Sequence, residues 1–112
     1  MNKVEKKLIK LSQRMKERNH ILGIKAEFEA EGTRSDELLR LLDIMSKSDL
    51  PLTLKIGGCE AKKDLFEARQ FGAKTIVAPM IESDYALKKF IDTVKHVYPH
   101  EEQSEVKFYF NI

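Results

Sequence analysis

The chain has little of several features that mark common classes of protein. It has a single cysteine, Cys59, so no disulfide can form within the chain, and we expect a reducing, cytoplasmic setting. No apolar run approaches the roughly 20 residues that a membrane-spanning helix needs. The charged start, MNKVEKKLIKL, contains no apolar signal core. Because 20 Lys and Arg accompany 18 Asp and Glu, we expect neither a nucleic-acid binder nor a protein that binds an anionic membrane, since either would gather positive charge on one face.

Short motifs that mark catalytic or metal sites are also missing. The sequence holds no CxxC, no Gly-x-Ser-x-Gly and no paired-histidine motif, and Gly57-Gly58 is not followed by the Lys-Ser/Thr of a P-loop. The histidines lie away from the predicted strand ends and share no metal-ligand spacing with Cys59, so we interpret them as surface residues. They are His20, His96 and His100.

What the chain does have is a regular alternation of strand and helix patterns within one domain, residues 1–112. An amphipathic helix is predicted over residues 2–18, with an apolar stripe of Val4, Leu8, Leu11 and Met15. Strands are predicted at 21–29, 52–57, 75–81 and 106–112. The three helices between them are expected to begin at a cap on Thr33 or Ser35, near Glu60 and after Ser83, and a polar loop is expected at 100–105. The stripes expected to face the core include Leu38, Leu39, Met45, Leu65, Phe66, Phe90 and Ile91.

Strands that alternate with helices predict an α/β fold with a parallel sheet and right-handed crossovers. Two such folds compete, a doubly wound sheet and a (β/α)8 barrel. Three of the strands have one apolar and one polar face; in the first, Lys25 and Glu27 oppose Ala26. A doubly wound sheet would bury those charges under helices, at a cost of several kcal/mol for each unpaired one. The alternation therefore favours the barrel, whose interior can pair the charges and admit water.

The length of the chain limits this prediction to part of a barrel. A typical barrel needs about 250 residues and eight units, whereas four units are present here, and the last strand, VKFYFNI, would leave an exposed apolar edge. We therefore expect the N-terminal half of a (β/α)8 TIM barrel with a leading helix. Either the sequence is truncated or two halves assemble.

Sites in parallel α/β folds lie at the carboxyl ends of the strands. The ends offer Glu27 and Glu29, then Lys55 followed by Gly57-Gly58, then Pro79 and Met80, and finally Asn111. This set suits a small anionic oxo-acid, with or without a divalent metal. Each member also has a plainer interpretation: the glutamates can pair with Lys25, Lys55 or Lys107, and the glycines can form a tight turn. Lys55 can hold a carboxylate, or form a Schiff base if it is desolvated.

Several of these segments resemble one known family. Ala78-Pro79-Met80-Ile81-Glu82-Ser83 is the most specific, and Lys55 at a strand end, Phe71-Gly72-Ala73, AEFEAEG and FYFNI accompany it. Over most of residues 21–112 the chain resembles the N-terminal half of the HpcH/HpaI aldolase/citrate lyase family. That resemblance implies a (β/α)8 barrel that makes or breaks a carbon–carbon bond of a 2-oxo acid or related acyl substrate. It also implies a divalent metal, Mg²⁺ or Mn²⁺, that stabilises an enolate.

The resemblance assigns roles to individual residues. Glu29 matches the acid of the first strand, with Glu27 as the other possibility, and Lys55 stands where the family has a substrate-binding arginine. Substrate contacts are implied for Gly57, Pro79, Met80 and Asn111. Ala30 replaces a histidine of the aldolase branch, and both expected metal acids fall beyond Ile112, so no metal ligand is assigned within the chain.

We therefore expect a lyase or aldolase that is incomplete in this chain, with a homo-oligomer or a missing C-terminal half as partner. The alternative is a non-catalytic half-barrel that serves as an assembly or interaction unit, motivated by the exposed strand 106–112 and the absent ligands.

Overall fold

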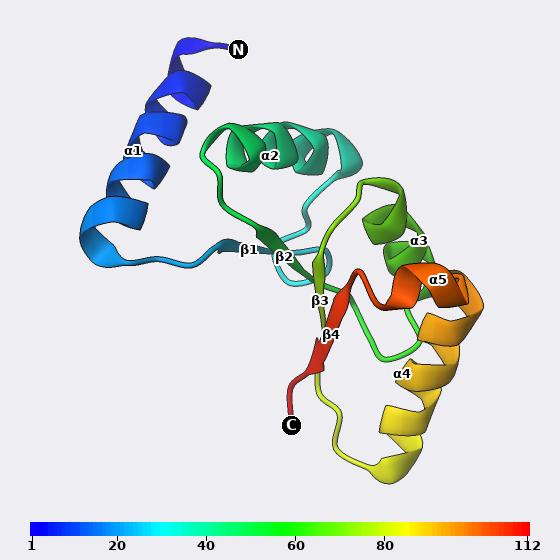
Figure 1. Cartoon of the computed structure of the whole chain (residues 1–112). Helices are drawn as coiled ribbons and strands as arrows, with labels where there is room; N and C mark the ends of the chain where they lie inside the picture. The colour runs from blue at the N-terminus through cyan, green and yellow to red at the C-terminus, as the bar shows by residue number, and fades with distance from the viewer.

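The structure is a computed structural model that describes residues 1–112 and contains five helices and four strands. A long helix, α1 (Lys3–Asn19), comes first, and strands then alternate with helices along the chain (Figure 1). The strands are β1 (Ile24–Glu27), β2 (Leu52–Lys55), β3 (Thr75–Ala78) and β4 (Lys107–Phe110). The other helices are α2 (Ser35–Lys47), α3 (Lys62–Gln70), α4 (Asp84–Val97) and the short α5 (His100–Gln103). The α/β class is confirmed, although each strand is shorter than its predicted range.

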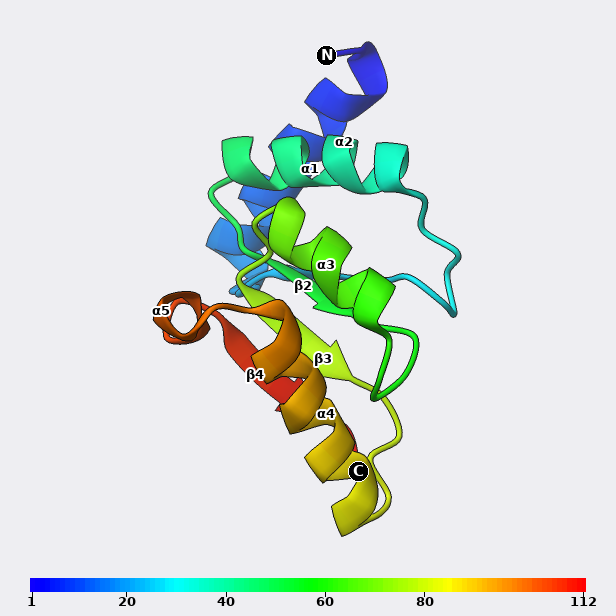
Figure 2. The same cartoon turned by 90° about the vertical axis from the view of Figure 1, so that its right-hand side faces the viewer.

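The four strands form one parallel sheet in the order β1-β2-β3-β4. Figure 2 shows α2, α3 and α4 on the same face of this sheet. The order follows the chain without the reversal that defines a doubly wound sheet, and the second face carries no helix layer. Within residues 1–112 every crossover therefore returns to the same side of the sheet, which is the arrangement expected of half a barrel.

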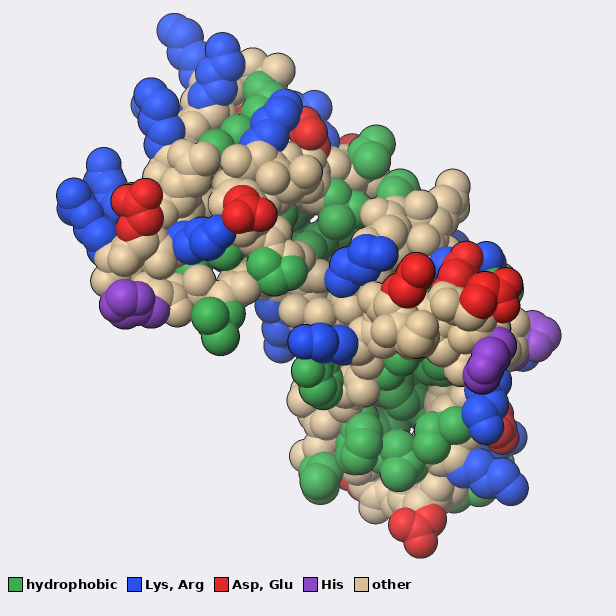
Figure 3. Space-filling model, in the orientation of Figure 1, with side chains coloured by type: hydrophobic (Ala, Val, Ile, Leu, Met, Phe, Trp, Pro, Cys, Tyr) green, Lys and Arg blue, Asp and Glu red, His purple; other side chains and the backbone are tan.

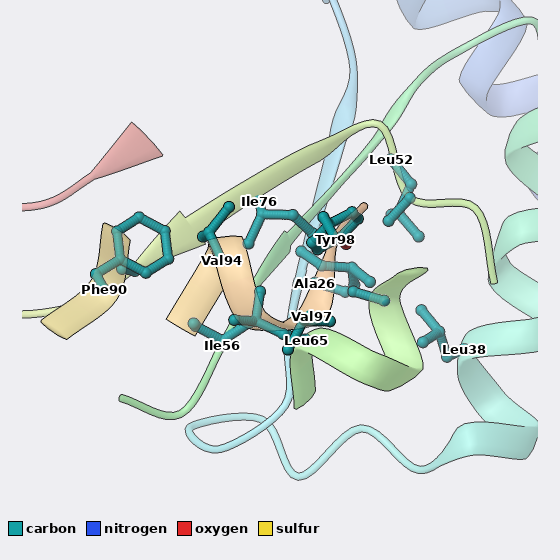
Figure 4. Close-up of a cluster of buried hydrophobic side chains, with 14 of the residues drawn as sticks. Ala26, Leu38, Leu52, Ile56, Leu65, Ile76, Phe90, Val94, Val97 and Tyr98 are labelled. Carbon is teal, nitrogen blue, oxygen red and sulfur yellow. The ribbon is translucent and has the colours of Figure 1, made fainter. Parts of the chain in front are cut away.

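Side chains alternate between the covered and the open face of the sheet. Leu54 and Ile76 are at most 1% exposed and belong to the cluster beneath the helices, part of which Figure 4 shows. Lys25, Glu27 and Lys55 alternate with buried positions, so they lie on the open face. The predicted division into an apolar and a polar face is confirmed, and it leaves the charged groups accessible to solvent instead of burying them.

The first helix stands apart from the sheet and packs on α2. An ion pair joins Glu5 to Arg40, and Lys16 Nζ lies 3.0 Å from Asp49 Oδ2. The predicted apolar stripe does not face α2: Val4 is 65% and Leu11 49% exposed. With about 100° between successive residues, the side of α1 that carries Glu5 and Ser12 is roughly a quarter turn from the stripe.

Several helix details differ from the sequence expectation. Leu39, Phe66 and Ile91 are exposed, because each helix buries a narrower stripe than its apolar residues allow. The cap of α2 is Arg34, whose backbone N–H donates to Glu37 Oε1 over 3.2 Å, so neither Thr33 nor Ser35 caps it.

The segment after α4 is not the predicted polar loop. Residues 100–103 form α5, since the carbonyl of Pro99 accepts from the N–H groups of Glu102 and Gln103. Arg69 Nε holds Glu102 Oε2 at 2.7 Å and anchors the turn to α3. No helix in the chain has the length and apolar character needed to cross a membrane.

Candidate functional site

The carboxyl ends of β1, β2 and β3 surround a small hollow of about 190 Å³. We name it the carboxyl-edge hollow, and its lining consists of Glu27, Glu29, Ala30, Lys55, Ile56, Gly57, Pro79 and Met80. Parallel strands bring their carboxyl ends to one edge, which is why residues from three separate segments meet here. Glu27, Glu29, Lys55, Gly57, Pro79 and Met80, all singled out from the sequence, lie together; Asn111 does not line the hollow.

A group of three charges crosses β1 and β2 at the hollow. Glu27 Oε1 lies 3.0 Å from Lys25 Nζ and 3.8 Å from Lys55 Nζ. The hydrogen bond from Lys25, aided by the charge of Lys55, lowers the pKa of the Glu27 carboxyl, and this outweighs the opposing effect of burial. Two ammonium groups share one carboxylate, so these three groups carry a net positive charge, which Glu29 of the same hollow balances. One of the plainer interpretations of Glu27, pairing with Lys25 and Lys55, is confirmed.

Glu29 differs from Glu27 in having no ion-pair partner within 4 Å. Glu29 lies two residues after Glu27, past the end of β1, and its side chain reaches over Gly57. It is exposed, so its carboxylate is open to solvent and to the hollow. Lys107, the third lysine considered from the sequence, forms no pair with either glutamate.

Gly57 makes room in the hollow and does not offer a free amide. A Cβ added at Gly57 would meet Asp64 Oδ2 at 3.1 Å and Glu29 Oε2 at 3.3 Å. The Gly57 N–H already donates to Asp64 Oδ2 over 2.7 Å, so it is not free to bind an anion. Asp64 was not among the residues predicted from the sequence; the signal for it is an acid in the first turn of a helix that follows Gly-Gly.

The third strand end shapes the rim of the hollow. Met80 adopts the left-handed backbone conformation, with φ of 51°, and its side chain is 73% exposed. Asn111 ties β4 to this turn through its backbone, since its N–H donates to the Ala78 carbonyl and its carbonyl accepts from the Ile81 N–H. The backbone of Asn111 therefore supports the turn that places Pro79 and Met80, while its side chain lies outside the hollow lining.

The donor set of the hollow does not fit a divalent metal. No group of three or more His, Cys, Asp and Glu side chains is arranged to hold an ion. The two carboxylates of the hollow are unequal, because Glu27 lies between two ammonium groups that would repel a cation. Lys55 is the one cation of the lining and therefore the group available to an anion.

The remaining reactive side chains lie elsewhere. Cys59 is a free, half-buried thiol in the loop before α3, and the three histidines are exposed, as predicted. Comparison of the chain with protein-family models, with curated proteins and with solved structures finds no match. The function proposed next therefore depends on the carboxyl-edge hollow itself.

Proposed function

We propose that the chain forms half of a (β/α)8 barrel and binds the carboxylate of a 2-oxo acid in a carbon–carbon lyase or aldolase site. The observation that carries the proposal is the position of the Lys55 ammonium. It lies at the carboxyl edge of a parallel sheet and is the one cation that lines the hollow there, beside Glu27 and Glu29. Carboxylates of small metabolites are bound by such cations.

The half-barrel part of the proposal draws support from the layers of the fold. The strands follow in chain order, the helices α2 to α4 cover one face, and the opposite face carries charged and polar side chains. In a closed barrel that second face becomes the interior, and the carboxyl ends of its strands carry the site.

The chemistry divides between two residues of the hollow. Lys55 pairs with the substrate carboxylate and orients it, while Glu27 positions Lys55. Glu29, which has no cation beside it, takes a proton from the carbon next to the substrate carbonyl and returns it in the reverse direction. The divalent metal implied by the family resemblance would take its ligands from outside these 112 residues, and we assign no step to it.

Imine formation by Lys55 is the less favoured route. A nucleophilic lysine works as the neutral amine and is usually desolvated, whereas Lys55 is 24% exposed and lies beside a carboxylate. Borohydride reduction in the presence of pyruvate distinguishes the routes: the carboxylate-binding role predicts no covalent adduct at Lys55.

Titration of the ¹⁵N-labelled chain with pyruvate and with oxaloacetate, each with and without Mg²⁺, tests the proposal. We expect shifts at residues that line the hollow, and binding that Lys55→Gln weakens by about tenfold, since a charged hydrogen bond contributes roughly 1.5 kcal/mol or more. Lys107→Gln is the matched control, because it removes the same charge from the same face of the sheet, outside the hollow. Equal affinity of Lys55→Gln and the unaltered chain would refute the assignment of Lys55.

A second candidate function is a non-catalytic assembly unit. It is favoured by the outer edge of β4, which pairs with β3 on one side and with nothing on the other. Failure of all oxo-acids to bind, together with a stable assembly, would support this alternative.

A further inference from the structure

Two apolar surfaces of the chain lack a partner, and they lie at opposite ends of the row of helices. The first is the α1 stripe, formed by Val4, Leu8, Leu11 and Met15, whose spacing of three and four residues places them on one side of the helix. Val4, Leu8 and Leu11 are 65%, 42% and 49% exposed, while the side of α1 that packs on α2 carries Glu5 and Ser12. The side of α1 that faces its own chain therefore carries Glu5, Ser12 and the partly buried Ile9, while Val4, Leu8 and Leu11 face outward.

The second surface is a groove of about 340 Å³ between α4 and β4. Its apolar lining consists of Leu87, Phe90, Ile91, Val94, Phe108 and Phe110. Figure 3 shows this groove, with hydrophobic side chains gathered between β4 and α4. Large apolar surfaces of this kind mark interaction sites on soluble chains.

The strands beside these two surfaces have open edges. On β4, the N–H groups of Lys107 and Asn111 donate toward β3, so the backbone groups of Phe108 and Phe110, which alternate with them, point outward. On β1, the N–H groups of Ile24 and Phe28 donate toward β2, and those of Lys25 and Glu27 point outward. The Glu27 carbonyl accepts from the Thr33 N–H at 3.4 Å, so the edge of β1 is open chiefly at Lys25.

The charges beside the two surfaces are complementary at the acidic turn before β4. α1 carries seven Lys and Arg against two Glu. Residues 100–105 contain Glu101, Glu102 and Glu105; Glu102 pairs with Arg69 and Lys95 lines the groove, so Glu101 and Glu105 are the acids that remain for the basic helix. α1 leads into β1 through a short connection, so its last turn, with Arg18, lies toward the amino ends of the strands. α5 immediately precedes β4 and lies at the same end. A second copy that continues the parallel sheet would therefore bring its basic helix end toward this acidic turn.

We propose that two copies of this chain pair about a twofold axis, with the α1 stripe of each copy in the α4–β4 groove of the other and β4 beside the other copy's β1. The pairing gives each apolar surface a partner and continues the parallel sheet through both copies. Each copy has one stripe and one groove, so a twofold dimer contains two identical stripe-to-groove contacts. No stripe or groove is then left uncovered. The inference depends on the edges of the fold and not on the carboxyl-edge hollow, so it stands or falls independently of the lyase proposal.

The mass of the 112-residue chain in solution is the first test. Sedimentation equilibrium is expected to give twice the 13.0 kDa of one chain, with association that weakens as salt rises because unlike charges meet at the interface. A chain that remains monomeric at millimolar concentration overturns the proposal. Assembly into open polymers also overturns it, since the twofold arrangement is closed.

Charged substitutions on the two surfaces identify the interface. Leu11→Lys and Ile91→Glu each place a charge on an exposed apolar position, 49% and 43% exposed, and each is expected to raise the dimer dissociation constant on the order of 100-fold. Leu39→Lys, on the 57% exposed Leu39 of α2, is the matched control and should dimerise like the unaltered chain. Leu8→Lys serves as the second α1 variant if circular dichroism shows that Leu11→Lys does not fold.

Mixing the two variants provides the decisive result. A heterodimer of Leu11→Lys with Ile91→Glu contains one unaltered interface and one in which Lys meets Glu, so the mixture is expected to regain the dimer mass that each variant alone has lost. If the mixture remains monomeric while both variants are folded, the α1 stripe and the groove do not meet and the proposed arrangement is wrong.

Discussion

At the scale of single residues, Tyr98 shows the sharpest conflict between burial and polarity. Its side chain is 2% exposed, and its ring packs edge-to-face on Phe108 with 5.1 Å between ring centres. The hydroxyl has no hydrogen-bond partner in the protein. Burial raises the pKa of Tyr98 to about 12, against the opposing effect of Arg69. The ring of Tyr98 therefore stabilises the core, while its buried, unpartnered hydroxyl lowers the free energy of unfolding.

Tyr98→Phe removes that cost and is expected to stabilise the chain at neutral pH. An unpartnered buried hydroxyl costs about 1 kcal/mol or more, and phenylalanine keeps the ring contacts. The free energy of unfolding, measured by urea denaturation at pH 7, should rise by about 1 kcal/mol. A lower stability of the variant would show that the hydroxyl has a bonding partner.

The same substitution should alter the response to alkali. The folded state holds the phenol proton more tightly than the unfolded state, whose pKa is near 10.0. The stability contributed by the neutral phenol is therefore fully present below about pH 10 and is lost as the pH rises toward about 12. The difference in unfolding free energy between Tyr98→Phe and the unaltered chain should widen over that range. Tyr109→Phe, at a side chain that is 52% exposed, is the control and should show no such change.

At the scale of elements, the ends of α4 and α2 contrast in how they are capped. The Ser83 hydroxyl accepts from the Ala86 N–H at 3.1 Å, and Asp84 adds a negative charge in the first turn, where the helix dipole favours it. The residue foreseen as a cap for α2, Thr33, has no such role, because α2 begins after Arg34. A residue with a good capping side chain therefore marks the start of a helix only where the helical backbone begins directly after it.

Ser83→Ala is expected to destabilise the chain by about 1 kcal/mol, since it leaves the Ala86 N–H without its acceptor. Thr33→Ala should change stability by less than about half of that, because the Thr33 side chain accepts no cap hydrogen bond. Thermal denaturation of both variants beside the unaltered chain makes the comparison. A larger loss for Thr33→Ala would place the start of α2 earlier than the structure has it.

At the scale of the whole molecule, the chain is elongated, with extents of 45 × 28 × 26 Å. The core lies between the sheet and α2, α3 and α4, whereas α1 extends from one end of this layer (Figure 1). The α1 contacts with the rest of the chain include the Glu5–Arg40 pair and the hydrogen bonds of Lys16 to Asp49. Local stability should therefore be lowest in α1 when the chain is alone.

Amide hydrogen exchange tests this distribution. In dilute solution, α1 amides should exchange at least about tenfold faster than those of α4, and the central strands β2 and β3 should exchange slowest. Raising the protein concentration should slow exchange in α1 and β4 together, because the proposed pairing covers both. The Leu11→Lys variant, measured at the same concentrations, should keep fast exchange in α1. Uniform exchange across all helices would contradict this order of local stability.

Much of the fold follows from the sequence because local signals and burial agree. The alternation of Lys25, Glu27 and Lys55 with apolar neighbours places the charges on one side of the sheet, and the period of two in a strand allows no other division. Gly72 follows α3 with φ of 75°, the left-handed conformation in which a glycine commonly ends a helix. The same logic placed Glu29, Lys55, Gly57, Pro79 and Met80 at one edge, because parallel strands share the direction in which they end.

Other features were decided only by the tertiary structure. The pattern of α1 defines an apolar stripe but not what covers it, and packing on α2 through Glu5 and Ser12 left Val4, Leu8 and Leu11 of that stripe exposed. The sequence does not show whether the Gly57 N–H is free to bind a ligand. In the folded chain it donates to Asp64 Oδ2, 2.7 Å away. The sequence by itself determined which residues prefer water and whether the apolar residues of each segment recur with the period of a strand or of a helix. Those are local properties. Which surfaces meet, and which donors remain free, depends on contacts between residues that are distant in the chain, and only the folded arrangement fixes them.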